Sequence, residues 1–125
     1  MKNVIVLLLL FSSIINLYSQ QVQKSEKINP SIALSDVYFV VQTLESIELT
    51  APEVDAYLEV REIFNSTLKN SADKKSTDIV HVEMSLNTAQ NLLSFLNRAK
   101  LSGARADQFK RVWDTIVEEV KKARK

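Results

Sequence analysis

The sequence of 125 residues contains no cysteine, one glycine and two prolines. Without cysteine, the chain cannot form a disulfide scaffold, a zinc ribbon or a thioredoxin-like redox site. With one glycine, it cannot form the glycine-rich phosphate loop of a doubly wound nucleotide-binding fold. An all-β sandwich or barrel needs turn residues about every 8–12 positions, and this chain has too few of them. These absences favour a small, nearly all-helical domain.

The chain also has little net charge, because its 16 Lys and Arg residues nearly balance its 15 Asp and Glu residues. Nucleic-acid binding depends on an excess of positive charge that contacts the phosphate backbone. We therefore expect no nucleic-acid partner.

The N-terminal segment has the pattern of a secretory signal peptide. Lys2 precedes an uncharged apolar run at residues 4–11, polar residues follow, and Ser19 is a small residue suited to cleavage. The alternative is a membrane anchor, but the apolar run is much shorter than the roughly 20 residues of a spanning helix. We expect cleavage after Ser19, a secreted or periplasmic protein, and no stable membrane anchor in the mature chain.

The rest of the chain is expected to form one domain. Residues 20–28 are polar and are predicted to be a disordered leader, whereas residues 29–125 are predicted to be a single helical-bundle domain. Without residues 1–19 the chain has 106 residues, which suffice for one hydrophobic core and not for two domains.

The first two predicted helices are placed by their N-terminal signals. Asn29 is suited to cap a helix that begins with Pro30, since proline lacks only an N–H that would be unpaired there. Thr50 and Glu53 form a capping box in front of a second helix, which predicts a connection of one or two residues and an antiparallel hairpin. The core positions expected are Val37, Val40, Val41, Leu44 and Ile47 in the first helix, and Val54, Tyr57, Leu58, Ile63, Phe64 and Leu68 in the second.

Two further helices are predicted after a loop at residues 69–76, because apolar residues recur alternately three and four positions apart. The series are Ile79, Val82, Leu86, Ala89, Leu93 and Leu96, and then Ala106, Phe109, Trp113, Ile116, Val120 and Ala123. Gly103 is expected at the C-cap of the third helix. This spacing favours coiled-coil-like packing. We therefore expect an all-α, up-down-up-down four-helix bundle; a looser array of two hairpins that closes by dimerising is the alternative.

Few residues are suited to catalysis or metal binding. His81 is the only histidine, and neither a di-iron bundle nor a catalytic zinc site can be built on one histidine. A serine nucleophile would also have to use His81, and the single glycine rules out a G-x-S-x-G turn. We therefore predict a protein that is not an enzyme, with no catalytic, metal-binding or cofactor-binding residues and no cofactor.

The aromatic residues leave a second class of function open. Phe64, Phe95, Phe109 and Trp113 lie at helical spacing, where aromatic side chains are usually part of a core. The alternative is that they line a cavity. In that case the chain is a small carrier that binds an apolar ligand in the bundle core.

Charges of opposite sign are concentrated in two parts of the sequence. Residues 36–62 hold seven acids and one base, and residues 98–125 hold nine bases and four acids. An up-down bundle brings these parts together at one end, where we expect charged contacts of Glu45, Glu48, Asp55, Arg98, Lys100 and Arg105, with Glu53 beside them. The simpler interpretation is pairing within the chain, and the alternative is a surface of both signs that attracts a partner or a second copy.

The third predicted helix has no charged residue after Glu83 and before Arg98. Depletion of charge is typical of the core of a protein interface. We expect a partner-binding surface at Asn87, Gln90, Asn91, Ser94 and Asn97, with an ordinary hydrated face as the alternative. The first functional hypothesis is therefore an exported helical bundle that binds a protein partner or a second copy, in an accessory, chaperone-like or inhibitory role.

Signal-peptide removal is directly testable. After expression in an exporting host, we expect the purified protein to begin at Gln20, since the apolar run and Ser19 together specify the cleavage site. Intact-mass and N-terminal peptide measurements check this outcome. A retained Met1 in the exported protein would contradict it.

Overall fold

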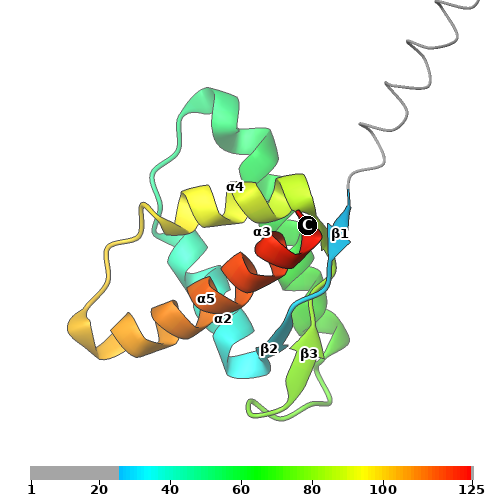
Figure 1. Ribbon diagram of the computed structural model, residues 1–125. Helices are drawn as coiled ribbons and strands as arrows, with labels where there is room; N and C mark the ends of the chain where they lie inside the picture. The colour runs from blue at the N-terminus through cyan, green and yellow to red at the C-terminus, as the bar shows by residue number, and fades with distance from the viewer. Residues whose placement is uncertain (1–25, 125) are drawn as a thin grey trace, which may run out of the picture.

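The computed structural model describes residues 26–124, and most of them lie in four α-helices (Figure 1). The helices are α2 (Leu34–Glu45), α3 (Val54–Asn70), α4 (Leu86–Leu96) and α5 (Ala106–Ala123). The 3-10 turns η1 (Ala51–Glu53) and η2 (Gly103–Arg105) precede α3 and α5. The predicted predominance of helix is therefore confirmed. No helix within residues 26–124 is both long enough and apolar enough to cross a membrane.

The predicted signal peptide lies outside the described residues, as does the leader up to residue 25. The last residues of the predicted leader are not a free tail. Lys27–Ile28 form the strand β1, and the ordered domain therefore begins before Asn29.

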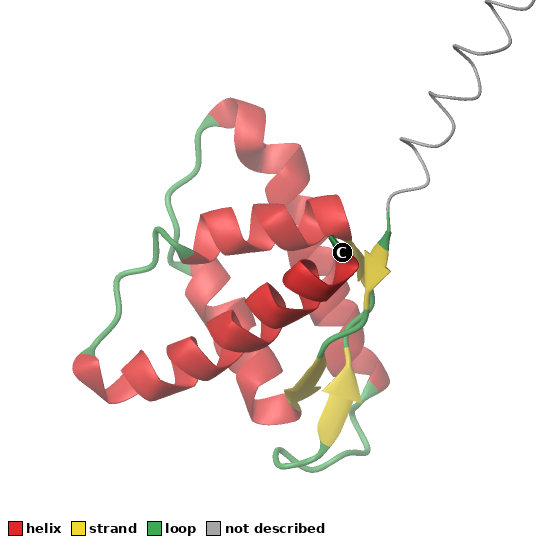
Figure 2. Cartoon of the chain, in the orientation of Figure 1, coloured by secondary structure: helices red, strands yellow, loops and turns green. Residues whose placement is uncertain are grey.

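Short strands form a two-stranded ribbon at the edge of the helices (Figure 2). β1 pairs antiparallel with β4 (Met84–Ser85), and β2 (Ser31–Ala33) pairs antiparallel with β3 (Ile79–His81). Both pairs have the same register. Between them, the Val82 N–H donates to the Pro30 carbonyl at 3.1 Å and continues the pairing. Pro30 has no N–H to return, which accounts for the interruption between the pairs. At the two ends of the ribbon, the Leu86 N–H donates to the Glu26 carbonyl and the Leu34 N–H donates to the Asp78 carbonyl, both at 2.9 Å.

The ribbon corrects two predicted helix boundaries. Pro30 is not the first residue of a helix, and Ile79 does not begin one; α2 starts at Leu34 and α4 at Leu86. Within residues 28–33 and 79–85 the even-numbered residues are buried and the odd-numbered ones are mostly exposed, which is the period of a strand with one face on a core. The buried row contains Ile28, Pro30 and Ile32 from one segment and Val80, Val82 and Met84 from the other.

The connection between α2 and α3 also differs from the expectation. α2 ends at Glu45, and residues 46–53 lie between the helices, so the predicted joint of one or two residues is wrong. The Thr50–Glu53 capping box is present. The Glu53 carboxylate accepts a hydrogen bond from the Thr50 N–H at 3.0 Å and from its hydroxyl at 2.8 Å.

Gly103 does not cap the third helix. α4 already ends at Leu96, and Gly103 begins the 3-10 turn η2. No residue within the described part of the chain has a positive φ angle. A left-handed glycine is therefore not what ends this helix.

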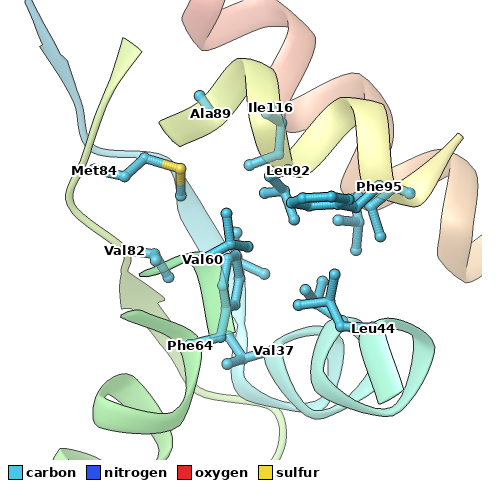
Figure 3. Close-up of a cluster of buried hydrophobic side chains, with 14 of the residues drawn as sticks. Val37, Leu44, Val60, Phe64, Val82, Met84, Ala89, Leu92, Phe95 and Ile116 are labelled. Carbon is cyan, nitrogen blue, oxygen red and sulfur yellow. The ribbon is translucent and has the colours of Figure 1, made fainter. Parts of the chain in front are cut away.

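The core lies where α3 packs against α2 and α4, where α4 packs against α5, and where the inner face of the ribbon closes one side (Figure 3). Leu44, Val60, Phe64, Leu92 and Ile116 are almost completely buried. The Tyr57 hydroxyl donates to the buried Leu44 carbonyl at 2.9 Å, which joins α3 to the end of α2.

Several predicted core positions lie elsewhere. In α3 the buried positions are Tyr57, Val60 and Phe64, whereas Val54 and Leu58 are 40% and 41% exposed. Ile79 is exposed because it lies on the outer face of the ribbon, and Ala106 is exposed at the start of α5. In α3 the apolar spacing fits two helix faces, and packing against neighbours selects the one that holds Tyr57, Val60 and Phe64.

Truncation of Leu92 tests the central packing. Leu92→Ala should lower the free energy of unfolding by about 2–5 kcal/mol, because it leaves a cavity beneath α4. The matched change Leu101→Ala, at an exposed leucine, should change it by less than about 0.5 kcal/mol. Urea unfolding followed by circular dichroism measures both. Equal losses for the two variants would contradict this placement of the core.

Candidate functional site

The predicted partner-binding residues form one stripe along α4. Ser85 caps the helix by accepting the Thr88 N–H at 3.0 Å, so the stripe begins on the first turn. Asn87, Gln90, Ser94 and Asn97 recur every three or four positions and are exposed, while Asn91 is half-buried at the side of the stripe. The opposite face of α4 is buried through Ala89, Leu92 and Leu96. We call these five residues the α4 stripe.

The position of the α4 stripe is set by the buried side chains on the opposite face of α4 and not by the stripe's own side chains. Within residues 26–124, none of its five side chains is engaged in an ion pair, and none makes a hydrogen bond to another described residue. Amide and hydroxyl groups of this kind retain their donors and acceptors for an external group. The structure thus brings the five predicted residues together on one face of a buried helix.

An aromatic groove adjoins the C-terminal end of the stripe. Asn97 shares a surface hollow of about 330 Å³ with Phe109, Lys110, Trp113 and Asp114 of α5. The Phe109 and Trp113 rings stack with centroids 5.8 Å apart and planes inclined by 20°. Both rings are half-buried.

The sequence predicted Phe109 and Trp113 as core positions or, in the alternative, as the lining of a cavity in the bundle core, and it did not predict a hollow at the surface. One signal was available. Lys110 and Asp114 have the same four-residue spacing as the two rings, and they form an ion pair at 2.6 Å along the edge of the groove. Charged residues interleaved with the aromatic pair indicate a helix face at the border between core and solvent.

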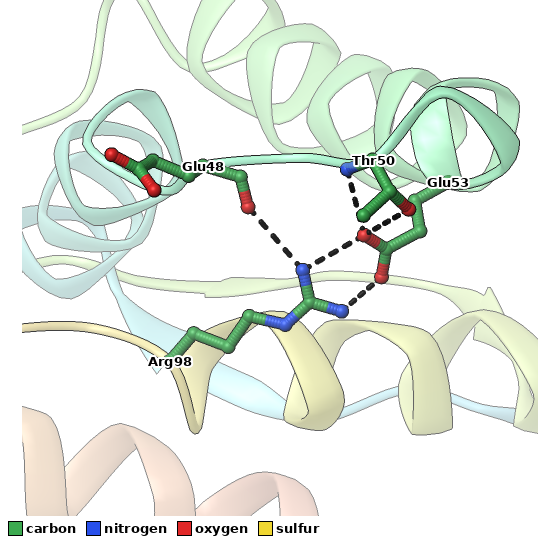
Figure 4. A network of polar contacts seen from close by, with 4 residues as sticks. All are labelled: Glu48, Thr50, Glu53 and Arg98. Carbon is green, nitrogen blue, oxygen red and sulfur yellow. Dashed lines mark hydrogen bonds and ion pairs between the residues drawn. The ribbon is translucent and has the colours of Figure 1, made fainter.

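One expected charged contact forms between the α2–α3 connection and the end of α4 (Figure 4). The Arg98 guanidinium donates two hydrogen bonds to the Glu53 carboxylate and a third to the Glu48 carbonyl at 3.3 Å. The hydrogen bonds from Arg98 and Thr50 lower the pKa of Glu53 to about 2, and the Glu53 carboxylate raises the pKa of Arg98. The Glu53 carboxylate of the capping box that precedes α3 thus also holds the C-terminal end of α4.

The other residues of that predicted charged end are not joined in one cluster. Arg105 donates to the Gln42 side chain at 2.9 Å, and its guanidinium lies 4.7 Å from the centre of the Phe39 ring. Glu45, Asp55 and Lys100 are exposed, and within residues 26–124 no ion pair includes them. Arg98 and Lys100 line a surface hollow with Glu48 of the α2–α3 connection.

A second polar clamp was missed by sequence reasoning. Asp36, on the first turn of α2, has a side chain only 3% exposed. It accepts two hydrogen bonds at 2.8 Å from Arg111 and one at 3.0 Å from Gln108, both on α5. The Arg111 hydrogen bonds hold the pKa of Asp36 below its ordinary value against the opposing effect of burial. No local sequence pattern around Asp36 predicts this contact, because its partners lie more than 70 positions further along the chain.

His81 lies on the exposed face of β3, where its Nδ1 is 3.2 Å from the Ser31 hydroxyl on the paired strand. The pair resembles a serine–histidine dyad only in composition, since it is a cross-strand contact on the outer face of a ribbon. Within residues 26–124, no three His, Asp or Glu side chains are placed to hold one metal ion.

The Asp36 clamp generates a pH prediction. Asp36→Asn should lower the free energy of unfolding by about 1–3 kcal/mol at neutral pH, because a buried acceptor of charged hydrogen bonds is lost. The folded pKa is depressed, so the difference between wild type and variant should be complete above the unfolded value of about 3.9. It should disappear as the pH falls through the folded pKa. Urea unfolding at a series of pH values measures this, and a difference that persists at the acid end would contradict it.

No family model, curated protein or solved structure matches the chain. Its function is therefore inferred from its own surface.

Proposed function

We propose that this chain is an exported, non-enzymatic helical protein that binds another protein through the α4 stripe. In this proposal residues 1–19 are removed, and the four helices act as one bundle that presents α4. The observation that carries the proposal is the stripe itself: five amide and hydroxyl side chains on one helix face, with no charge among them.

The composition of the stripe supports a protein partner. Exposed helix faces usually carry Lys and Glu, whereas interface cores are depleted in charge. Burying an amide costs little when the partner supplies a hydrogen bond, but burying an unpaired charge costs far more. An uncharged stripe is therefore suited to a contact that excludes water.

The position of the stripe also supports the proposal. α4 packs against α3 and α5, and the Arg98–Glu53 contact fixes its C-terminal end. A surface on a rigid element loses little conformational entropy when it binds. Asn97 lines the groove together with Phe109 and Trp113. Aromatic side chains of this kind often contribute most of the binding energy of a protein interface. Accessory, chaperone-like and inhibitory roles are all compatible with such a surface.

The aromatic groove supports a second candidate, the carrier of an apolar ligand. Its volume of about 330 Å³ lies at the lower end of the range for small-molecule sites. A carrier would show a change in Trp113 fluorescence when an apolar probe such as a long-chain fatty acid is added. A protein-binding surface predicts no such change.

The proposal is tested by placing a photo-crosslinking amino acid at Gln90 or Ser94 and activating it in the native host. We expect a covalent adduct of defined mass with one protein. The control position is Thr77 before β3, which is exposed but lies on another element. It should give no such adduct.

Two like charges introduced into the stripe provide the second measurement. Gln90→Lys with Ser94→Lys should abolish the adduct formed from a probe at Asn87, because both charges would be buried without partners and cannot pair with each other. Thr77→Lys should leave it unchanged, and circular dichroism should show the same helix content in all variants. Equal adduct yields from stripe and control positions would refute the proposal.

A further inference from the structure

The outer face of α3 combines exposed apolar residues with unpaired acids. Val54 and Leu58 lie one turn apart and are 40% and 41% exposed. Asp55, Glu59 and Glu62 are exposed on the same helix. We call these five residues the α3 acidic face.

The charge of this face is not neutralised within the described part of the chain. No ion pair of residues 26–124 includes Asp55, Glu59 or Glu62. Glu59 and Glu62 accept only hydroxyl hydrogen bonds, from Thr88 and Ser66. Arg61, the cation on this half of the helix, lies over the Tyr57 ring at 5.8 Å from its centre.

A basic corner lies where the last turn of α5 meets β1. Lys121, Lys122 and Arg124 are exposed there. A hollow of about 350 Å³ beside them is lined by Lys27, Ile28, Asn29, Glu119, Lys122 and Ala123. Lys122 pairs with Glu119 at 3.4 Å and Lys27 with Glu83 at 3.2 Å, while no ion pair within residues 26–124 includes Lys121 or Arg124.

Within residues 26–124, these two surfaces carry charges of opposite sign that belong to no ion pair, Asp55, Glu59 and Glu62 on one and Lys121 and Arg124 on the other. We infer that the α3 acidic face of one copy binds the basic corner of a second copy. Leu58 enters the hollow beside Ala123, and Asp55 and Glu62 flank it with carboxylates that face Lys121 and Arg124 of the second copy. The chain is nearly neutral overall, so an assembly of copies balances its charge without another component.

The contact joins two different patches, which makes it heterologous. A heterologous contact leaves one acidic face and one basic corner free after each addition, so copies add head to tail unless the rotation closes a ring. The α4 stripe is no part of this contact and remains free for another protein.

The test uses protein purified after expression of the full chain, followed by sedimentation velocity. At low ionic strength the average mass of the wild type should rise with concentration, and added salt should return it to that of one chain, because exposed charges are screened. A wild type that keeps the mass of one chain at every concentration and ionic strength overturns the inference.

Two charge-reversed variants make the test specific. Asp55→Lys with Glu62→Lys makes the acidic face positive, and Lys121→Glu with Arg124→Glu makes the basic corner negative. Each variant alone should lose self-association, because like charges then meet. A 1:1 mixture should regain it, since each variant's altered patch complements the other's. Circular dichroism should show that both variants remain folded.

Control variants place single charge reversals of each sign in the exposed loop before β3. Asp73→Lys and Lys75→Glu should associate as the wild type does. A mixture of the two reversed variants that stays at the mass of one chain overturns the inference, as do reversed variants that associate like the controls. None of these results bears on the α4 stripe, whose own test is crosslinking at Gln90 and Ser94.

Discussion

The fold depends on the pairing of residues 26–34 with residues 78–86. This ribbon joins two segments that lie far apart in sequence, and each of them continues directly into a helix, α2 from β2 and α4 from β4. The starts of α2 and α4 are therefore set by one hydrogen-bonded ladder. Its inner row of apolar residues closes one side of the core, and α5 lies against both β1 and β2. A one-residue slip of the ladder would turn that row to solvent.

Two ionic contacts complete the arrangement that the ribbon begins. Asp36 ties the first turn of α2 to α5 through Arg111, and Glu53 ties the start of α3 to the end of α4 through Arg98. Both acids lie near helix N-termini, where a carboxylate is favourable even before it finds a partner. The remaining α3 acids lie outside these contacts. Charge in this protein thus has two separate uses, one internal to the fold and one on its surface.

The sequence predictions that the structure confirms rest on signals between residues close together in the chain. The Thr50–Glu53 capping box marks the start of α3, and the spacing through Ile116 and Val120 marks α5. The ribbon was missed because Ile79, Val82 and Leu86 fit a helix, while Val80, Val82 and Met84 fit a strand. Only the pairing with residues 26–34 decides between them. The α4 stripe followed from composition, whereas the Asp36 clamp arises from a contact between helices far apart in the sequence, which no local pattern records.

The ribbon also imposes an order on how the chain becomes a folded protein. Its first strand lies near the N-terminus, but the strand that completes it follows only after both α2 and α3. A nascent polypeptide therefore exposes Ile28 and Ile32 without cover until Val80, Val82 and Met84 have followed. Closing so long a loop is slow, and the open form is vulnerable to aggregation. Folding of this domain thus depends on how soon residues 78–86 pair with residues 26–34, as well as on the stability of the final structure.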